Sequence, residues 1–261
     1  ITDPWIEKTN GGSNSGVDGA EVIWADAAGL VQLSSTPIVR DAVGNAYLDF
    51  TVPADNIQGG NAVVAVKKGN TVIWSWHLWF APEDVLSTIP VTNKQGKVYN
   101  FTKETLGWKP TVWEGSSYDK DRMVKVGIEQ TVANSGIKQF AVINLIQKAG
   151  CARLGSATFY QFGRKDAFPG VPNVDIKEGG ITASQNDEMS IKNGIQNPGV
   201  FYPGSHKLST GPTNSYSYYN LWSMDNTATG FNDNVVVKTV YDPCPAGFKM
   251  PASNAFTGFT E

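Results

Sequence analysis

Two apolar segments joined by a short polar turn constrain the fold of this chain more than any other feature. Residues 61–67 read Asn-Ala-Val-Val-Ala-Val-Lys, residues 71–80 read Thr-Val-Ile-Trp-Ser-Trp-His-Leu-Trp-Phe, and Gly69 lies in the turn between them. Such a pattern predicts a β-hairpin. The second arm alternates between two faces, with Trp74, Trp76 and Leu78 on one and Ile73, His77 and Trp79 on the other. Because both faces are apolar, we interpret this strand as buried on both sides; an aromatic ligand platform is the alternative.

The composition narrows the class of protein further. Hydrophobic residues make up 41% of the 261 residues and charged residues only 17%, against a usual ~25%, with 27 Gly, 14 Pro and a net charge of −3. The aromatic content argues against a disordered chain, and the charge balance argues against a nucleic-acid-binding protein. No apolar run reaches the ~18 residues of a membrane span. These features predict a loop-rich, mainly β protein.

Further strands are predicted along the first 150 residues. Short apolar or alternating runs occupy 21–25, 30–33 and 46–52. Residues 81–120 are interpreted as a long connection with a helical turn at 82–86 and one strand at 97–101. A second hairpin is expected from 121–130 and 136–148, with its turn at Asn134-Ser135-Gly136. Its alternating residues are Val124, Val126 and Ile128 in the first arm, and Ala141, Ile143 and Leu145 opposite Phe140, Val142 and Asn144 in the second.

The pattern changes after Gly150. Residues 151–234 consist mainly of Asn, Gly, Pro, Ser and aromatic residues, without regular alternation. Asn and Ser side chains satisfy backbone groups in turns, so we expect an ordered but irregular region. A strand is predicted at 234–240, followed by a short helix from Asn254 with Ser253 as its N-cap.

Residue types used in catalysis or metal binding are few and scattered. The histidines are His77 and His206, and no H-x-x-x-H or C-x-x-C spacing occurs. We therefore predict no catalytic residue, no metal site and no cofactor. His77 is interpreted as a hydrogen-bonded core residue. For Cys151 and Cys244, two separate buried thiols are favoured over a disulfide, because the sequence does not show that they lie close together.

Three polar groups have both a functional and a structural interpretation. Arg164-Lys165-Asp166 offers charges to a ligand, but a buried ion pair that fastens loops is favoured. Asp119 with Asp121, and the run 232–234 (Asn-Asp-Asn), supply oxygen ligands suited to calcium; without a twelve-residue binding loop, solvated turns are favoured. Asp242, before a proline, is interpreted as a turn residue.

An aromatic cluster is the best candidate for ligand binding. It consists of Tyr216, Tyr218, Tyr219 and Trp222, next to Ser217 and Asn220. Flat aromatic faces beside amide and hydroxyl groups suit the CH faces and hydroxyls of sugars. The alternative is that these rings anchor the surrounding loops.

Three stretches resemble a known family. They are 158–169 (Thr-Phe-Tyr-Gln-Phe-Gly-Arg-Lys-Asp-Ala-Phe-Pro), 220–223 (Asn-Leu-Trp-Ser) and 241–251 (Tyr-Asp-Pro-Cys-Pro-Ala-Gly-Phe-Lys-Met-Pro). Together they resemble the C-terminal module of Bacteroides-type fimbrillin-like surface proteins, which is related to the Fibrobacter major paralogous domain. Residues 61–66 and 74–79 resemble the β domain that precedes this module.

The resemblance implies a fold, a location and a role. It implies a β-sandwich-like domain over 1–150, and an irregular C-type-lectin-like module over 151–261 that we expect to be truncated at its C-terminus. It also implies export to the cell surface or outer membrane with lipoprotein-type or fimbrial association, and a non-enzymatic role in adhesion. Expected partners are other pilus or surface subunits, or host or dietary glycans. The alternatives are a structural pilus subunit without a ligand and a carbohydrate-binding module; an edge of a hairpin accepting a partner strand is a further route to assembly.

Overall fold

The computed structural model divides the chain into two compact units. Unit 1 comprises Ile1–Lys109 and Ala157–Glu261, and unit 2 comprises Pro110–Ser156. The residues described are 16–118, 121–132, 135–148, 150–161, 163–170, 178–184, 191–202, 222–223 and 231–259, with the backbone alone at 110–118 and 150–155. This division differs from the expected boundary after residue 150, because the segment that follows unit 2 returns to the same body as the first 109 residues.

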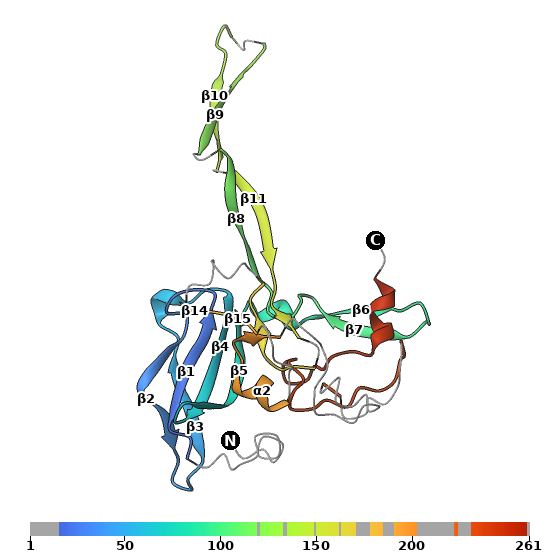
Figure 1. Cartoon of the computed structure of the whole chain (residues 1–261). Coiled ribbons are helices and arrows are strands. Elements are labelled where there is room, and N and C mark those ends of the chain that lie inside the picture. The colour runs from blue at the N-terminus through green and yellow to red at the C-terminus, as the bar shows by residue number, and fades with distance from the viewer. Residues whose placement is uncertain are drawn as a thin grey trace. The chain divides into compact units, whose positions relative to one another are not determined.

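Unit 1 is built around an antiparallel four-stranded sheet in the order β14-β1-β4-β5 (Figure 1). Its strands are β1 (Gly19–Ala25), β4 (Gly60–Lys68), β5 (Thr71–Phe80) and β14 (Glu178–Gly179). β4 and β5 form the predicted hairpin, with Val64 opposite Trp76 in its register. Gly69 in the turn has φ 57°, a backbone conformation that favours glycine. The sequence prediction of this hairpin is confirmed.

The central sheet is covered on both faces. Neighbouring residues of a strand point to opposite faces, and both Val63 and Val64 are buried. Val64 packs in a cluster with Leu30 and Val31, whereas Val63 packs with Trp24 and Ala167. On β5, the neighbouring residues Ile73 and Trp74 are also both buried, whereas residues 76–80 are half-buried. The prediction of a strand buried on both sides is therefore confirmed for the first half of β5.

Smaller elements surround the sheet. The β2–β3 hairpin contacts β1, and α2 contacts β5 (Figure 1). The elements are β2 (Gln32–Arg40), β3 (Ala46–Thr51), η1 (Ala54–Asn56), η2 (Glu83–Leu86), β6 (Thr88–Thr92), β7 (Val98–Thr102), β12 (Phe159–Tyr160), β13 (Ala167–Phe168), β15 (Thr182–Ala183), α2 (Ile191–Gln196), β16 (Val200–Phe201) and η5 (Ser253–Gly258). The described part of residues 157–259 thus contains only short elements, as the irregular composition predicts.

Three local predictions need correction. Residues 81–120 contain the β6–β7 hairpin and the start of unit 2, rather than a connection with one strand. Residues 234–240 are not a strand; the one bridge found there joins Lys238 to Ser223. Val235 is 67% exposed, and among the described residues the valine run has no neighbouring strand on which to pack, despite its β propensity. The expected helix from Asn254 is the 3₁₀ helix η5, and its N-cap is Ala252, without a side-chain cap.

Unit 2 is a long two-stranded ribbon. β8 (Lys109–Tyr118) pairs with β11 (Gly150–Ser156), and β9 (Arg122–Glu129) pairs with β10 (Phe140–Gln147). β9 and β10 are the second predicted hairpin, which is confirmed (Figure 1). Ser135 and Gly136 in its turn both have positive φ, which allows the tight reversal.

The chain leaves and re-enters unit 1 at one place. The hydroxyl of Thr158, just after unit 2, donates a hydrogen bond to the carbonyl oxygen of Leu106, just before it, at 3.1 Å. Gly107 has φ 76°, and a Cβ there would lie 1.9 Å from the Thr158 Oγ1. A glycine at 107 is therefore what allows the two segments to approach this closely.

The structure thus confirms a mainly β fold. The β-sandwich-like and lectin-like assignments remain predictions. Among the described residues, no helix is long and apolar enough to cross a membrane.

Candidate functional site

The predicted sugar-binding cluster is only partly described. Tyr216, Tyr218 and Tyr219 lie outside the described residues. Trp222 is 8% exposed, and its indole N–H donates to the backbone carbonyl of Arg164 at 2.8 Å. Since a sugar platform needs an accessible ring face, the position of Trp222 favours the alternative that it anchors a loop.

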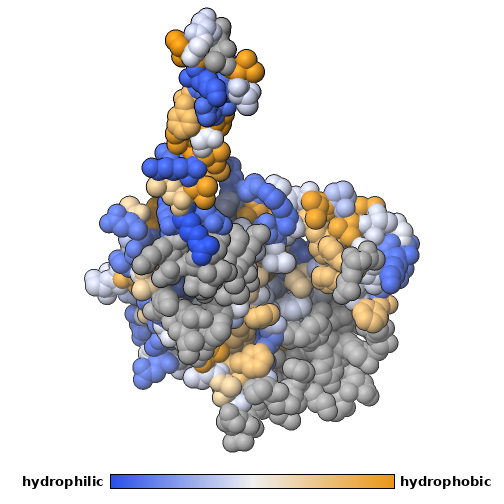
Figure 2. All heavy atoms as spheres, turned by 90° about the horizontal axis from the view of Figure 1, so that it is seen from above, coloured by the Kyte–Doolittle hydropathy of each residue, from blue (hydrophilic) through white to orange (hydrophobic). Residues whose placement is uncertain are grey.

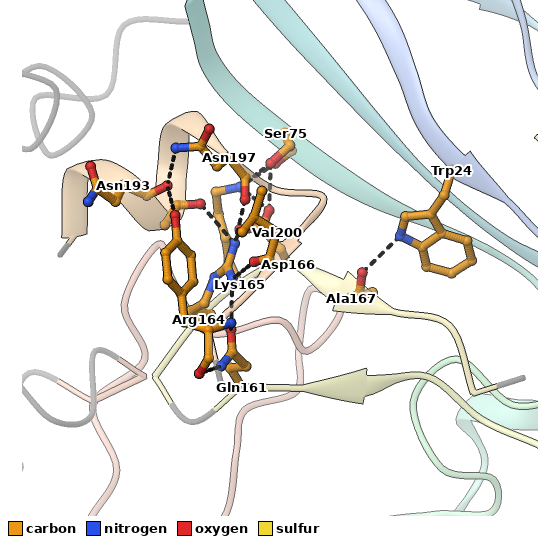
Figure 3. A network of polar contacts seen from close by, with 12 residues as sticks. Trp24, Ser75, Gln161, Arg164, Lys165, Asp166, Ala167, Asn193, Asn197 and Val200 are labelled. Carbon is orange, nitrogen blue, oxygen red and sulfur yellow. Dashed lines mark hydrogen bonds and ion pairs between the residues drawn. The ribbon is translucent and has the colours of Figure 1, made fainter. Parts of the chain in front are cut away.

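Arg164 is the centre of a buried polar network (Figure 3). Its guanidinium donates to the backbone carbonyls of Gly194 in α2 at 3.0 Å, Asn197 just after it at 3.1 Å and Val200 at the start of β16 at 2.7 Å. It also donates to the side chain of Gln161 at 2.9 Å. The planar fork of an arginine thus fastens the end of a short helix that has few hydrogen bonds of its own.

Lys165 and Asp166 connect this network to the central sheet (Figure 3). The Asp166 carboxylate accepts from Lys165 Nζ at 2.6 Å, from Ser75 Oγ on β5 at 2.6 Å and from Arg164 Nη2 at 3.3 Å. Burial alone would raise the pKa of Asp166, but the charges of Lys165 and Arg164 outweigh it and lower the pKa. The triplet is therefore the buried ion pair that the sequence favoured, and its charges are used within the fold.

His77 is a satisfied core residue. The Asn61 side-chain N–H group donates to Asp26 and Gly107, so its amide oxygen accepts from the His77 Nε2–H at 2.9 Å. The Tyr160 hydroxyl donates to His77 Nδ1 at 2.7 Å. Burial lowers the pKa of His77 to about 4. Both ring nitrogens are occupied, so His77 is poorly suited to act as a general base.

A small pocket lies beside His77. It has a volume of about 390 Å³, and its lining includes Trp79, Pro82, Leu106 and Pro243. These walls are apolar, and the histidine at this site has both nitrogens engaged. The pocket offers no set of converging polar groups that would orient a substrate.

Cys244 is a free thiol in a structural turn. Asp242 accepts hydrogen bonds from the backbone N–H groups of Cys244 at 2.8 Å and Met250 at 2.9 Å, which confirms its role as a turn residue. Burial, together with the charge of Asp242, raises the pKa of Cys244 to about 12. The thiolate that nucleophilic chemistry requires is therefore disfavoured. The side chain of Cys151 lies outside the described residues.

The Asn232-Asp233-Asn234 run uses its oxygen atoms in protein hydrogen bonds. The Asp233 carboxylate accepts from Tyr99 at 2.5 Å, Asn93 at 2.8 Å and Asn254 at 2.8 Å. It therefore ties η5 to the β6–β7 hairpin. In the described ranges, no three His, Cys, Asp or Glu residues form a group that could hold a metal ion, and Asp119 lies outside those ranges.

The strongest candidate for a functional surface is the β9–β10 hairpin. Every described residue of both strands is exposed. In Figure 2, hydrophobic residues lie at the surface of the ribbon on the side that the view shows. In a folded protein, large apolar side chains are exposed singly, and a contiguous patch marks an interaction site. This hairpin exposes large apolar side chains on both strands, namely Met123, Val124, Val126, Ile128, Phe140, Val142, Ile143, Leu145 and Ile146.

The register assigns these side chains to two unlike faces. Residues directly opposite in a pair of strands point to the same side of the sheet. On one side, which we call the dry face, the pairs are Ile128 with Ala141, Val126 with Ile143 and Val124 with Leu145. The pair at the end of this face is Arg122 with Gln147. The dry face is thus six consecutive apolar positions without a charge among them.

The opposite side, the mixed face, carries charges and amides among its apolar residues. Its pairs are Glu129 with Phe140, Gly127 with Val142, Lys125 with Asn144 and Met123 with Ile146. The ring of Phe140 lies over Gly127, since a Cβ on that glycine would be 3.2 Å from a ring carbon. An aromatic ring covering a glycine is a common device in β ribbons. The mixed face therefore suits water better than the dry face.

The sequence showed the alternation of this hairpin but not its exposure. An apolar strand pattern is the same whether a sheet face packs inside the protein or outside it.

The comparisons with known proteins do not identify a family. No protein-family model matches the chain, and the searches of curated proteins and of solved structures also gave no match. The functional assignment therefore depends on the residues and geometry described above.

Proposed function

We propose that this chain is a non-enzymatic, exported surface protein whose β9–β10 hairpin joins it to another protein, as the subunits of a fimbria or other surface assembly are joined. The single observation that carries the proposal is the dry face. A two-stranded ribbon is marginally stable in water by itself and needs a covered hydrophobic face. A protein partner that covers this face would stabilise the ribbon and the assembly together.

The resemblance to fimbrillin-like surface proteins supports the location and the class of partner. In this proposal, the whole assembly carries out adhesion, and this chain is one of its structural subunits. The chemistry of the described residues supports a non-enzymatic role, because His77 has both nitrogens engaged and Cys244 is held as a thiol. Direct glycan binding by Tyr216, Tyr218 and Tyr219 remains a prediction, and the burial of Trp222 does not favour it.

Two neighbouring residues provide a matched test. Ile143 is on the dry face and Asn144 is on the mixed face, so Ile143→Lys and Asn144→Lys add the same side chain to opposite sides of one strand. Each variant is expressed in the source cells in place of the wild-type chain, and surface material is sheared off and sedimented. We expect the wild type and Asn144→Lys to sediment with the assembled material, and Ile143→Lys to remain in the supernatant.

The proposal fails if the wild-type chain is absent from the sheared surface material, or if Ile143→Lys sediments as the wild type does. Purified variants are first compared by thermal unfolding. Since β10 is exposed on both faces, neither lysine should alter the stability of unit 1.

A further inference from the structure

The dry face is suited to a partner of a particular kind. A flat sheet face packs best on another sheet face about 10 Å away, with the two sets of side chains interleaved. All six residues of the dry face have aliphatic side chains, of which alanine is the smallest and leucine and isoleucine are the largest. The layer that they form therefore contains no side-chain group that needs a hydrogen bond. The partner must therefore offer an equally apolar and uncharged sheet surface.

A second copy of the chain carries such a surface. We propose that two chains associate by packing the dry face of one β9–β10 hairpin on the dry face of the other, around a two-fold axis. This inference specifies the partner in the proposed function and depends on it. In a two-fold interface, the same patch on both subunits must be complementary to itself. A wholly apolar layer satisfies this requirement because no like charges meet.

The charge at the end of the face is consistent with an antiparallel arrangement. Arg122 lies at one end of the dry face and Ile128 at the other. When the two hairpins run in opposite directions, the two Arg122 side chains lie at opposite ends of the interface. A parallel arrangement would bring these cations together. The two-fold axis then passes near the middle of the face, where Val126 pairs with Ile143.

The exposed area of the dry face sets an upper limit to the size of the interface. Its large side chains are each 37–57% exposed: Val124, Val126, Ile128, Ile143 and Leu145. They and Ala141 expose roughly 500 Å² per chain, so their complete burial in two chains would cover at most about 1,000 Å², the lower limit for a specific interface. The complex is therefore expected to form reversibly and to depend on concentration.

Association also covers the apolar face of each ribbon. In the described part of the chain, neither outer edge of the β9–β10 pair joins a further strand. Two hairpins packed face to face form four strands in two layers, with the mixed faces and their charges, Lys125 and Glu129 among them, turned to water. Each two-stranded ribbon, marginally stable in water by itself, thereby gains a covered hydrophobic face.

The test measures the mass of the purified full-length chain in solution. Sedimentation velocity of the wild type is expected to show a concentration-dependent species of twice the 28.2 kDa chain mass. Ile143→Lys should lower the association constant at least tenfold, whereas Asn144→Lys, on the mixed face of the same strand, should leave it unchanged. A dimer that persists in Ile143→Lys overturns the inference.

Disulfide trapping tests the geometry. In a Cys151→Ser, Cys244→Ser background, Val126→Cys places a thiol near the proposed axis and should form a cross-linked dimer under mild oxidation. Lys125→Cys, the neighbouring residue on the mixed face, should remain largely monomeric. Equal cross-linking of both variants overturns the face-to-face arrangement.

The outcome also distinguishes this inference from the proposed function. A wild-type chain that is monomeric at all concentrations overturns self-association, even if Ile143→Lys is still lost from the sheared surface material. In that case the dry face joins the chain to a different protein. If the face is instead covered within the same chain, Val126→Cys will be protected from a maleimide in the monomer, which also overturns self-association.

Discussion

Replacing Asp166 by asparagine should destabilise unit 1 severely and in a pH-dependent way. The carboxylate is 3% exposed and accepts hydrogen bonds from Lys165, Arg164 and Ser75. Asparagine keeps the shape but removes the negative charge, so two buried cations lose their counter-charge. Removing one partner of a buried ion pair costs about 3–5 kcal/mol.

The part of this cost that Lys165 causes has an upper limit, because the lysine can lose its charge. In the folded variant, Lys165 can lose its proton, which removes the unpaired buried charge. At pH 7, neutralising a lysine whose ordinary pKa is 10.5 costs about 5 kcal/mol, at 1.36 kcal/mol per pH unit. If the folded variant uses this route, its unfolded state binds one more proton than its folded state between pH 7 and 10.5. The stability of the variant then rises with pH. Burial lowers the pKa of Lys165 in the folded wild type as well, so the deficit against the wild type shrinks from pH 7 only up to that lowered pKa.

The measurement is urea unfolding followed by tryptophan fluorescence at pH 7 and pH 9. The partner variant Lys165→Met retains the pair of Arg164 with Asp166, and the double variant Lys165→Met with Asp166→Asn lacks the lysine that can lose its proton. We expect the double variant to lose less stability than the sum of the two single losses. From pH 7 to pH 9, Asp166→Asn should gain stability relative to the double variant, which lacks the lysine that can lose its proton. A loss below about 1 kcal/mol in Asp166→Asn, or no such gain relative to the double variant, would refute the reasoning.

Three further predictions test the described geometry. Because burial holds the pKa of His77 at about 4 against an ordinary 6.5, its contribution is complete above pH 6.5 and is lost as the pH falls toward 4; the wild type should lose about 3 kcal/mol more than His77→Gln over this range in urea unfolding. Trp222→Phe removes the hydrogen bond to the Arg164 carbonyl and should lower the melting temperature by a few degrees, about 1 kcal/mol, and no change would show that this bond is not needed. Cys244, with its pKa raised to about 12, should react with iodoacetamide at pH 8 at least tenfold more slowly in the folded chain than in urea when Cys151 is replaced by Ser, and equal rates would contradict the pKa.

The elements predicted correctly are those specified by neighbouring residues. The β4–β5 and β9–β10 hairpins each have alternating apolar arms on either side of a glycine turn, and both form. The same local pattern failed at residues 234–240. A strand also needs a neighbour, and the sequence does not show that the Val235 side chain would face water.

The candidate site was harder to predict than the fold. Arg164, Lys165 and Asp166 were identified as a buried pair, but their partners on β5 and α2 lie far away in the sequence. The dry face was visible as an alternation, yet its exposure depends on what the rest of the chain covers. A sequence pattern identifies which residues share a face, and only tertiary structure shows whether that face is occupied.

The contact between Thr158 and Leu106 has a consequence for how this protein can change over evolution. These residues hold the two ends of the inserted ribbon together, so contacts within unit 1 offset the entropic cost of closing that loop. A longer or shorter ribbon would change this cost only slightly. The ribbon can therefore vary in length and sequence while the register of the central sheet stays the same. If the ribbon is the assembly surface proposed above, related chains can change their partner without changing the stability of unit 1.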